Sequence, residues 1–157
     1  MKDLIFDSPA GRLRLSEEAG AITRLEWTRA GAGGTPSPLL REARAQIASY
    51  FAGRRRAFDL PLAPHGTAFQ KQVWQALAAI PYGATVSYGE IARRIGARAA
   101  RPVGTACGAN PIPILIPCHR VLSATGALTG YSGRGGLKTK AALLTLEQGG
   151  RGIGQAA

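Results

Sequence analysis

Residues 110–121 read Asn-Pro-Ile-Pro-Ile-Leu-Ile-Pro-Cys-His-Arg-Val, and this apolar stretch constrains the fold more than any other part of the chain. Proline has no backbone N–H donor and a fixed φ angle, so three prolines within seven residues exclude a helix here. We expect an extended and stiff segment, which would deliver Cys118 and His119 to a fixed place in the molecule.

Cys118 is a candidate nucleophile because of its neighbours. A thiolate is the strongest nucleophile among ordinary side chains, but a free thiol, with a pKa of about 8.5, needs a base or a positive field. On an extended strand His119 would point away from Cys118, so we expect the proton to pass through a water molecule. Without these neighbours Cys118 would be interpreted as a small buried hydrophobe, and Cys107, in an apolar context, keeps that interpretation.

A histidine base usually has its other ring nitrogen held by a carboxylate or a carbonyl. The second half of the chain offers only Glu90 and Glu147 as acids. Glu90 follows Ser87 in a capping-box pattern, which makes Glu147 the better candidate for the partner of His119. The cysteines and histidines lack the spacing of a metal site, and no phosphate-binding glycine loop is present, so we expect neither a metal nor a cofactor.

The 157 residues carry a net charge of +11, from 20 Lys and Arg against 9 Asp and Glu. Residues 1–64 contain seven of the nine acids, so the positive field belongs mainly to the second half. This balance favours a polyanionic partner, nucleic acid first and an acidic membrane second, although an ordinary solvated surface is the alternative.

The chain shows no signal-peptide pattern, and its apolar runs are far shorter than the roughly 20 residues of a membrane-spanning helix. Two cysteines cannot build a disulfide framework. We therefore expect a soluble, cytoplasmic protein with 45% apolar residues, enough for a core.

The first half predicts a small α/β subdomain over residues 1–64. Short alternating runs in residues 1–26 predict an antiparallel meander, and Ser37-Pro38 predicts the start of a helix that ends near Gly53. A further strand is expected at residues 57–60, before prolines that mark a boundary near residues 61–66.

The second half, residues 65–157, predicts a mostly helical domain with a helix-turn-helix and the extended active-site segment, which makes the fold class α+β. Helices are expected after a capping box at Thr67, from Ser87 to Gly96, over residues 99–109 and over residues 137–147. The second and third of these form the helix-turn-helix candidate, although many helical hairpins bind nothing. Four arginines cluster around its turn and would place cations beside the helix N-termini: Arg93, Arg94, Arg98 and Arg101.

The run at residues 110–121 resembles the active-site signature of the O6-alkylguanine-DNA alkyltransferases, also called methylated-DNA protein-cysteine methyltransferases. The resemblance covers about residues 67–149, whereas residues 1–64 match only as a generic small subdomain. Other segments similar to the family pattern occur in the same order, at 69–74, 81–83, 87–88, 101–104, 130–133 and 146–147.

The resemblance implies a direct-reversal DNA repair protein, which transfers the alkyl group from O6-alkylguanine to its own Cys118. The product is a thioether, which cannot leave again, so each molecule would act once. His119 would receive the thiol proton through water and Glu147 would orient the histidine. Tyr88 would donate a proton to the leaving guanine, although an aromatic that packs the helix start explains it as well. Asn110 would tie the helix-turn-helix to the active-site strand and donate to the thiolate.

The resemblance also implies that double-stranded DNA carrying alkylated bases is the partner of a monomer, and that the base is rotated out of the helix. Arg101 matches the finger that enters the base stack, but Pro102, where the family more often has alanine, restricts its backbone. The recognition helix would lie in the minor groove and approach the backbone closely through Ala99, Ala100 and Gly104. The base pocket would be lined by Val121, Tyr131 and Ser132. No Cys or His precedes His65, so the zinc site of some members should be absent.

Three rival functions stay open at this point. A branch of the family lacks the cysteine and only marks damaged bases, a helix-turn-helix regulator would have an incidental thiol, and a cysteine hydrolase would regenerate its thiol. Cys118 argues against the first, Tyr88 and Ser132 would be unexplained in the second, and no oxyanion motif supports the third. The sequence leaves open which alkyl groups fit, whether O4-alkylthymine is accepted and whether binding to DNA is cooperative.

Overall fold

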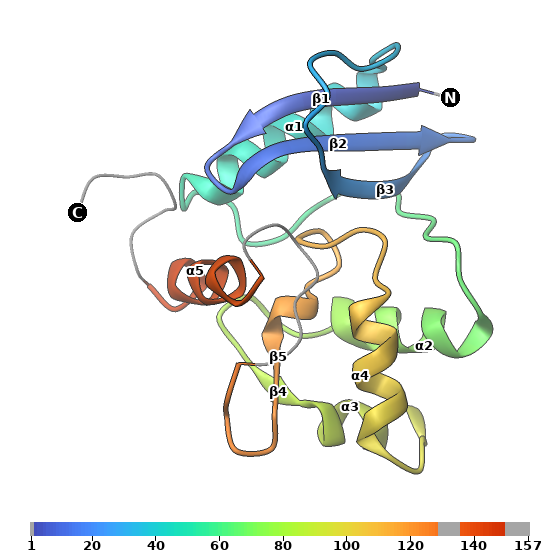
Figure 1. Cartoon of the computed structure of the whole chain (residues 1–157), viewed down its shortest axis with the longest axis vertical. Helices are drawn as coiled ribbons and strands as arrows, with labels where there is room; N and C mark the ends of the chain where they lie inside the picture. The colour runs from blue at the N-terminus through green and yellow to red at the C-terminus, as the bar shows by residue number, and fades with distance from the viewer. Residues whose placement is uncertain (1, 129–135, 150–157) are drawn as a thin grey trace.

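The computed structural model describes residues 2–128 and 136–149. The chain begins with a three-stranded antiparallel sheet in the order β1-β2-β3. Its strands span Lys2–Ser8, Gly11–Glu18 and Ala21–Trp27, with a bulge in the second pairing. The predicted meander is confirmed, and α1 covers one face of it (Figure 1).

Helix α1, Pro38–Phe51, begins as the sequence predicts. The Ser37 hydroxyl accepts a hydrogen bond from the backbone N–H of Leu40 at 3.1 Å, and Pro38 stands at the first helical position. Leu40, Ile47 and Tyr50 have no exposed surface, so the apolar face of the helix is fully used.

The strand predicted at residues 57–60 is wrong. The side chain of Gln46 takes the place of a strand neighbour: its Oε1 accepts from the N–H of Asp59 at 2.9 Å and its Nε2 donates to the Asp59 carbonyl at 3.2 Å. A single bridge to the sheet follows, in which Ile22 donates to the Pro61 carbonyl at 2.9 Å. The N–H of Ala63 donates back to the Ile22 carbonyl at 2.8 Å, which completes this single parallel bridge between Ile22 and Leu62.

The second half contains helices α2, Ala68–Ala78, α3, Tyr88–Ile95, α4, Ala100–Gly108, and α5, Leu137–Glu147. The predicted capping box at the start of α2 is confirmed, and the indole Nε1 of Trp74 donates to the Ala106 carbonyl at 2.9 Å, which ties α2 to α4. Helix α3 ends at Gly96, whose φ of +73° suits glycine, and α4 follows as the second helix of the predicted helix-turn-helix.

Two parallel strands of two residues each were not predicted. They are β4, Val86–Ser87, and β5, Val121–Leu122, and their short length carries no periodic signal. Strand β5 follows a short 3-10 helix, η1, Cys118–Arg120.

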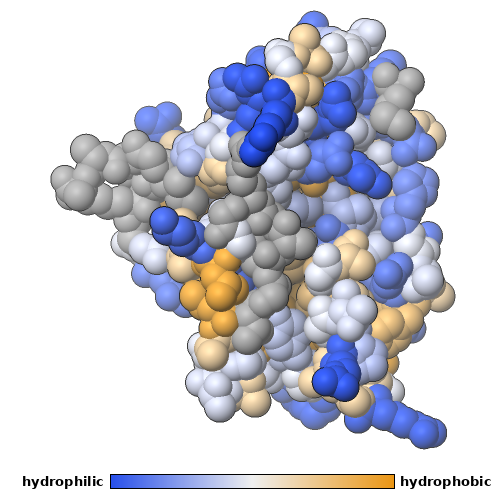
Figure 2. Space-filling model, in the orientation of Figure 1, coloured by the Kyte–Doolittle hydropathy of each residue, from blue (hydrophilic) through white to orange (hydrophobic). Residues whose placement is uncertain are grey.

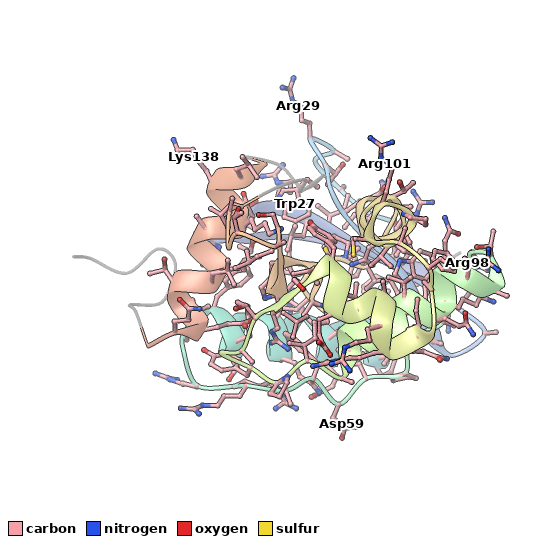
Figure 3. All side chains as sticks on the ribbon, turned by 90° about the horizontal axis from the view of Figure 1, so that it is seen from below. Trp27, Arg29, Asp59, Arg98, Arg101 and Lys138 are labelled. Carbon is pink, nitrogen blue, oxygen red and sulfur yellow. The ribbon has the colours of Figure 1, made fainter. Side chains whose placement is uncertain are left out.

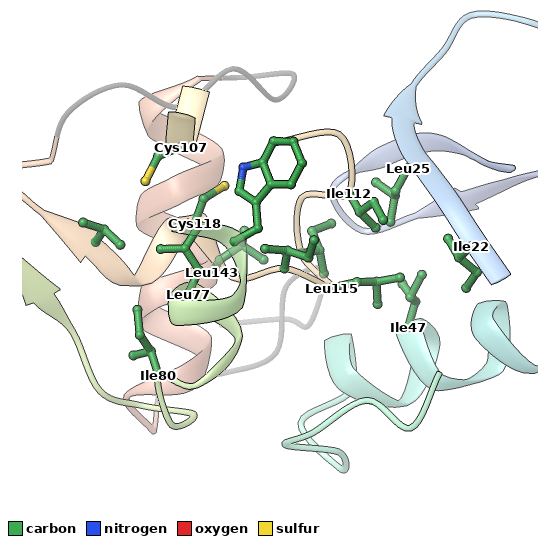
Figure 4. Close-up of a cluster of buried hydrophobic side chains, with 14 of the residues drawn as sticks. Ile22, Leu25, Ile47, Leu77, Ile80, Cys107, Ile112, Leu115, Cys118 and Leu143 are labelled. Carbon is green, nitrogen blue, oxygen red and sulfur yellow. The ribbon is translucent and has the colours of Figure 1, made fainter. Parts of the chain in front are cut away.

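One hydrophobic core joins the two halves. Figure 4 shows Ile22, Leu25 and Ile47 of the first half, Leu77 and Leu143 of the second, and side chains of the segment after α4 between them. The N–H of Leu25 also donates to the Pro111 carbonyl at 2.9 Å. The sheet is therefore anchored directly to the segment that carries the candidate nucleophile.

The face in Figure 2 is mostly hydrophilic, with hydrophobic residues in small separate areas. Among the described residues, no helix has the length and apolar character needed to cross a membrane.

Candidate active site

The segment before Cys118 is not extended, and that expectation is wrong. The N–H of Ile116 donates to the Ile112 carbonyl at 2.8 Å, and Ile114 has a φ of +74°. A β-branched residue at positive φ is strained, and such strain is found mostly at functional sites. The turn has a physical reason: the segment is buried, so its backbone groups need partners inside the protein.

Asn110 closes this turn. Its Nδ2 donates to the Ile116 carbonyl at 2.9 Å, and its Oδ1 accepts from the N–H of Ile112 at 2.9 Å. The Asn110 side chain also acts on Cys118, because it lowers the pKa of the thiol. Since Asn110 comes just after α4, it links the helix-turn-helix to the turn that leads to Cys118.

Cys118 opens the 3-10 helix η1. Pro117 has φ −81° and ψ 65°, and the N–H of Cys118 donates to the Ile116 carbonyl at 2.8 Å, which is the geometry of an inverse γ-turn. Side chains do not alternate between two faces in a 3-10 helix. The expectation that Cys118 and His119 lie on opposite faces of a strand is therefore wrong.

The Cys118 thiol lies in a buried setting, with 8% of the residue exposed. Burial raises the pKa of this thiol, while the hydrogen bond to Asn110 and the positive charge of Lys140 lower it in part. The thiol is thus protonated at rest and needs a base, as its sequence context suggests.

Glu147, at the end of α5, is held by both residues that follow Cys118. Its Oε2 lies 2.6 Å from Nε2 of His119. Arg120 donates from Nε to Oε1 at 2.7 Å and from Nη2 to Oε2 at 2.9 Å, a two-pronged ion pair. Burial alone would raise the pKa of Glu147, but the hydrogen bonds from His119 and Arg120 outweigh it and lower the pKa to about 2. Glu147 is therefore an anion that faces His119, as predicted.

His119 is fully buried, and burial lowers its pKa in spite of the Glu147 carboxylate. The ring is therefore neutral at pH 7 and can act as a base. Its Nε2 faces Glu147, and its buried Nδ1 has no hydrogen-bond partner among residues 2–128 and 136–149. This places the free acceptor position of the neutral ring on Nδ1.

The turn at Gly83 supports the same carboxylate. Gly83 has a φ of +82°, and a Cβ there would lie 3.1 Å from the Glu147 carbonyl oxygen. Its N–H approaches Oε1 of Glu147 at 3.4 Å. The Pro-Tyr-Gly segment at residues 81–83 therefore needs glycine because the end of α5 packs directly on it.

Tyr88 is the first residue of α3, and its hydroxyl accepts from Nζ of Lys140 at 3.5 Å. Lys140 is fully buried, its ammonium lies 5.8 Å from the Tyr88 ring centroid, and burial lowers its pKa. Cys118 and Cys107 both lie close enough to interact with its charge. Burial raises the pKa of Cys107 to about 12, which fits a packing role for that thiol.

All four arginines of the predicted cluster are exposed on the helix-turn-helix, and two of them are paired with an acid. The Glu90 carboxylate does not complete a capping box; it binds Arg93 at 2.6 Å and Arg94 at 2.9 Å. Arg98 and Arg101 are exposed and project from the surface (Figure 3), and neither forms an ion pair within the described part of the chain.

The remaining predicted site residues lie in different settings. Ala99 and Ala100 are exposed at the start of α4, whereas Gly104 is half-buried, and a Cβ there would lie 3.9 Å from the Tyr88 ring. Pro102 lies in the first turn of α4, where its missing donor costs nothing. Val121 is buried in β5. Tyr131 and Ser132 lie outside the described residues.

Three contributors to the site were missed: Arg120, Lys140 and Tyr50. Two of them could have been found from the sequence. Arg120 directly follows Cys118 and His119, and Lys140 stands seven residues before Glu147, on the same face of the predicted helix. Tyr50 was assigned to the apolar face of α1, and nothing in its surroundings along the chain indicates that its hydroxyl reaches Glu147.

Comparisons with known proteins agree over most of the chain. Residues 68–149 match the model of the 6-O-methylguanine DNA methyltransferase DNA binding domain, and residues 1–64 match that of the ribonuclease-like domain of the same proteins. The chain is 45% identical over 152 residues to a methylated-DNA–protein-cysteine methyltransferase of Methanosarcina acetivorans, covering 91% of this chain and 96% of that protein. It is 44% identical over 153 residues to the constitutive methylated-DNA–protein-cysteine methyltransferase of Bacillus subtilis, covering 90% and 92%.

A solved structure is also similar. The crystal structure of Mycobacterium tuberculosis OGT in complex with DNA superposes with a TM-score of 0.84 at 47% sequence identity, covering 94% of this chain and 93% of that one. The arrangement of sheet and helices is therefore shared with a protein that was crystallised on DNA.

Proposed function

The chain belongs to the methylated-DNA–protein-cysteine methyltransferase family, and we propose that Cys118 is the residue on which it receives the alkyl group. Its activity is the transfer of an alkyl group from O6-alkylguanine in DNA to a cysteine of its own, with base flipping and a single turnover. The observation that carries the assignment is the buried contact of 2.6 Å between Glu147 and His119, the residue next to Cys118.

The reaction begins with removal of the proton from the Cys118 thiol. Neutral His119 takes the thiol proton at Nδ1 through a water molecule, and the Glu147 anion stabilises the imidazolium that forms. The two-pronged ion pair with Arg120 holds the carboxylate in place. Asn110 donates to the sulfur and stabilises the thiolate.

The alkyl group is then displaced in line. The sulfur–carbon bond forms while the bond between carbon and guanine O6 breaks, and the electron pair stays with the guanine. The Tyr88 hydroxyl supplies the proton that neutralises the guanine, and Lys140, 3.5 Å away, stabilises the phenolate that results. Tyr131 and Ser132 are assigned to the base pocket with Val121 on the family pattern.

We assign DNA binding to the helix-turn-helix. Arg101 is the finger that fills the space of the extruded base, and Arg98 contacts phosphate, with Ala99, Ala100 and Gly104 close to the DNA backbone. Arg93 and Arg94 remain exposed and can exchange Glu90 for phosphate, because surface ion pairs are weak. Arg29 and Lys138 project from the same side as Arg101 (Figure 3), so this side is positive beyond the helix-turn-helix.

Residues 65–157 thus carry the acceptor and the DNA contacts, and residues 1–64 form a supporting subdomain. We propose that the protein acts in the cytoplasm, and its net positive charge and its DNA substrate support this proposal.

The test is the intact mass after incubation with a duplex that contains one O6-methylguanine. We expect the protein to gain one methylene unit on Cys118, and the repaired guanine to stop at one equivalent of active protein with DNA in excess. Cys118→Ser should bind this duplex and gain nothing, whereas Cys107→Ser should react normally. Transfer by a folded Cys118→Ser protein, or a yield that climbs past one equivalent, would contradict the assignment.

A further inference from the structure

A tyrosine of the N-terminal sheet subdomain touches the catalytic carboxylate. Tyr50 lies in the last turn of α1 with no exposed surface, and its hydroxyl donates to Oε2 of Glu147 at 2.6 Å. The same oxygen lies 2.6 Å from Nε2 of His119. Tyr50 and the histidine therefore share one acceptor atom, although 97 residues separate Tyr50 from Glu147.

Several hydrogen-bond donors share the negative charge of Glu147 at this oxygen. Oε2 also accepts from Nη2 of Arg120 at 2.9 Å, so three donors meet at one carboxylate oxygen. Each donor withdraws part of the negative charge that would otherwise stabilise a proton on His119. Removal of one donor should make the carboxylate a stronger partner for the imidazolium.

The Tyr50 hydroxyl is held in position by the packing of its ring. The ring lies edge-on to Phe51 and Tyr82, with centroids 5.4 Å and 6.2 Å away, and 5.3 Å from the ring of Phe58. Burial and the neighbouring Glu147 raise the pKa of Tyr50, so it remains a donor throughout the working range of the protein. A phenylalanine would keep these ring contacts and lose only the donor.

We propose that Tyr50 is a positioning residue of the proton relay, through which the N-terminal subdomain fixes Oε2 of Glu147 and sets the proton affinity of His119. The inference rests on the proposed roles of Cys118, His119 and Glu147. It gives the sheet subdomain a direct part in the reaction, beyond support of the fold.

The other titratable and charged groups around the relay are the same in wild type and in Tyr50→Phe. Those that interact with Glu147, His119 or Cys118 come from several elements: Tyr82 from a loop, Arg120 from η1, Cys107 from α4 and Lys140 from α5. Arg56 lies over the ring of Tyr82. Tyr50→Phe alters none of them.

The direct measurement is the ring titration of His119 by NMR with 15N-labelled histidine. The chain has two histidines, and His65 is exposed, so it serves as an internal reference. In Tyr50→Phe the titration of His119 should move to higher pH, because the carboxylate regains charge. The measurement is made in a Cys118→Ser background, so that thiol ionisation does not interfere.

The second measurement is the pH dependence of the single-turnover rate on a saturating O6-methylguanine duplex. Burial favours the neutral thiol and imidazole pair, so the acidic limb of the profile reports proton loss from His119. This limb should move to higher pH in Tyr50→Phe, in step with the ring titration. Tyr82→Phe is the matched control, because its hydroxyl approaches the Leu146 carbonyl at 3.4 Å rather than the carboxylate, and its limb should stay in place.

Site-specific 3-fluorotyrosine at position 50 covers the case in which Tyr50→Phe does not fold. The more acidic phenol donates more strongly, so the titration of His119 should move to lower pH. An unchanged His119 titration in either protein, or a shift of the opposite sign, would overturn the inference by itself. A shifted ring titration with an unmoved rate profile would overturn it through the proposed function, because His119 would then not carry the proton.

Discussion

Glu90 and Glu147 are the two acids of the second half, and each binds two basic side chains, yet they do different work. Glu90 lies on the surface of α3, where its side chain is 27% exposed and pairs with Arg93 and Arg94. The side chain of Glu147 is fully buried and meets His119, Arg120 and Tyr50. The comparison teaches that burial decides how strongly a carboxylate acts on its partners, because water and salt screen the surface pair but do not reach the buried one.

Glu147→Gln should have the largest effect of the substitutions that test the difference between the two glutamates. The variant leaves the Arg120 guanidinium, which is 8% exposed, without its anion, and loss of one partner of a buried pair costs about 3–5 kcal/mol. Urea unfolding measures this loss, and single-turnover kinetics on the folded fraction should show that transfer falls at least as far as in His119→Ala. Wild-type stability in this variant would refute the buried network.

Arg101→Ala is the corresponding test in the exposed region. It should slow the reaction with duplex DNA and leave the stability of the fold unchanged. We expect transfer from duplex DNA to slow roughly 10- to 100-fold, because the finger supplies part of the few kcal/mol of base extrusion and each 1.4 kcal/mol is about tenfold in rate. Unfolding should be unchanged.

Transfer from the free base O6-benzylguanine should be unaffected in Arg101→Ala. Arg98→Ala also removes one exposed positive charge from the helix-turn-helix, so it shows how much of the slowing on the duplex comes from the lost charge alone. Equal slowing on the duplex and on the free base would contradict the finger role.

Acid should weaken the buried network gradually. The pKa of Glu147 is lowered from 4.5 to about 2, so its stabilisation is complete above about pH 4.5 and is lost as the pH falls toward 2. The difference in unfolding free energy between wild type and Glu147→Gln should therefore shrink over this range. A difference that stays constant from pH 7 to pH 3 would show that the carboxylate is not held as an anion.

The smallest effect is expected for Glu90→Gln. Arg93 and Arg94 also lower the pKa of Glu90, but substitution of this half-buried surface group should change neither the melting temperature nor the rate on the free base. Two arginines are released, so binding to undamaged duplex should tighten at low salt and converge with wild type at high salt. A fall in transfer on the free base would break the distinction between the two glutamates.

The local features of the fold were predicted well because they depend on neighbours in the sequence. The meander follows from alternation in residues 1–26, and α1 and α2 begin at Ser37 and Thr67, whose hydroxyls cap them. Helix α5 spans residues 137–147 as its pattern predicts. The strand at residues 57–60 was wrong because a distant amide, Gln46, satisfies its backbone instead.

The candidate site was predicted in part. Cys118, His119 and Glu147 were chosen from residue chemistry and from the family resemblance, and the contact between His119 and Glu147 is confirmed. The turn at Ile114 was missed, because prolines restrict φ without fixing the path of a buried backbone.

The sequence by itself determined the helices, the antiparallel meander, the basic second half and the family, and it singled out Cys118 as the candidate nucleophile, because caps, periodicity, charge and motif residues act over a few positions. Only the tertiary structure decided which groups meet at the Glu147 carboxylate. Tyr50, Arg120 and Glu147 meet because one core joins the sheet subdomain to the helices. The low dielectric of that core then makes contacts between residues distant along the chain stronger than any pairing at the surface.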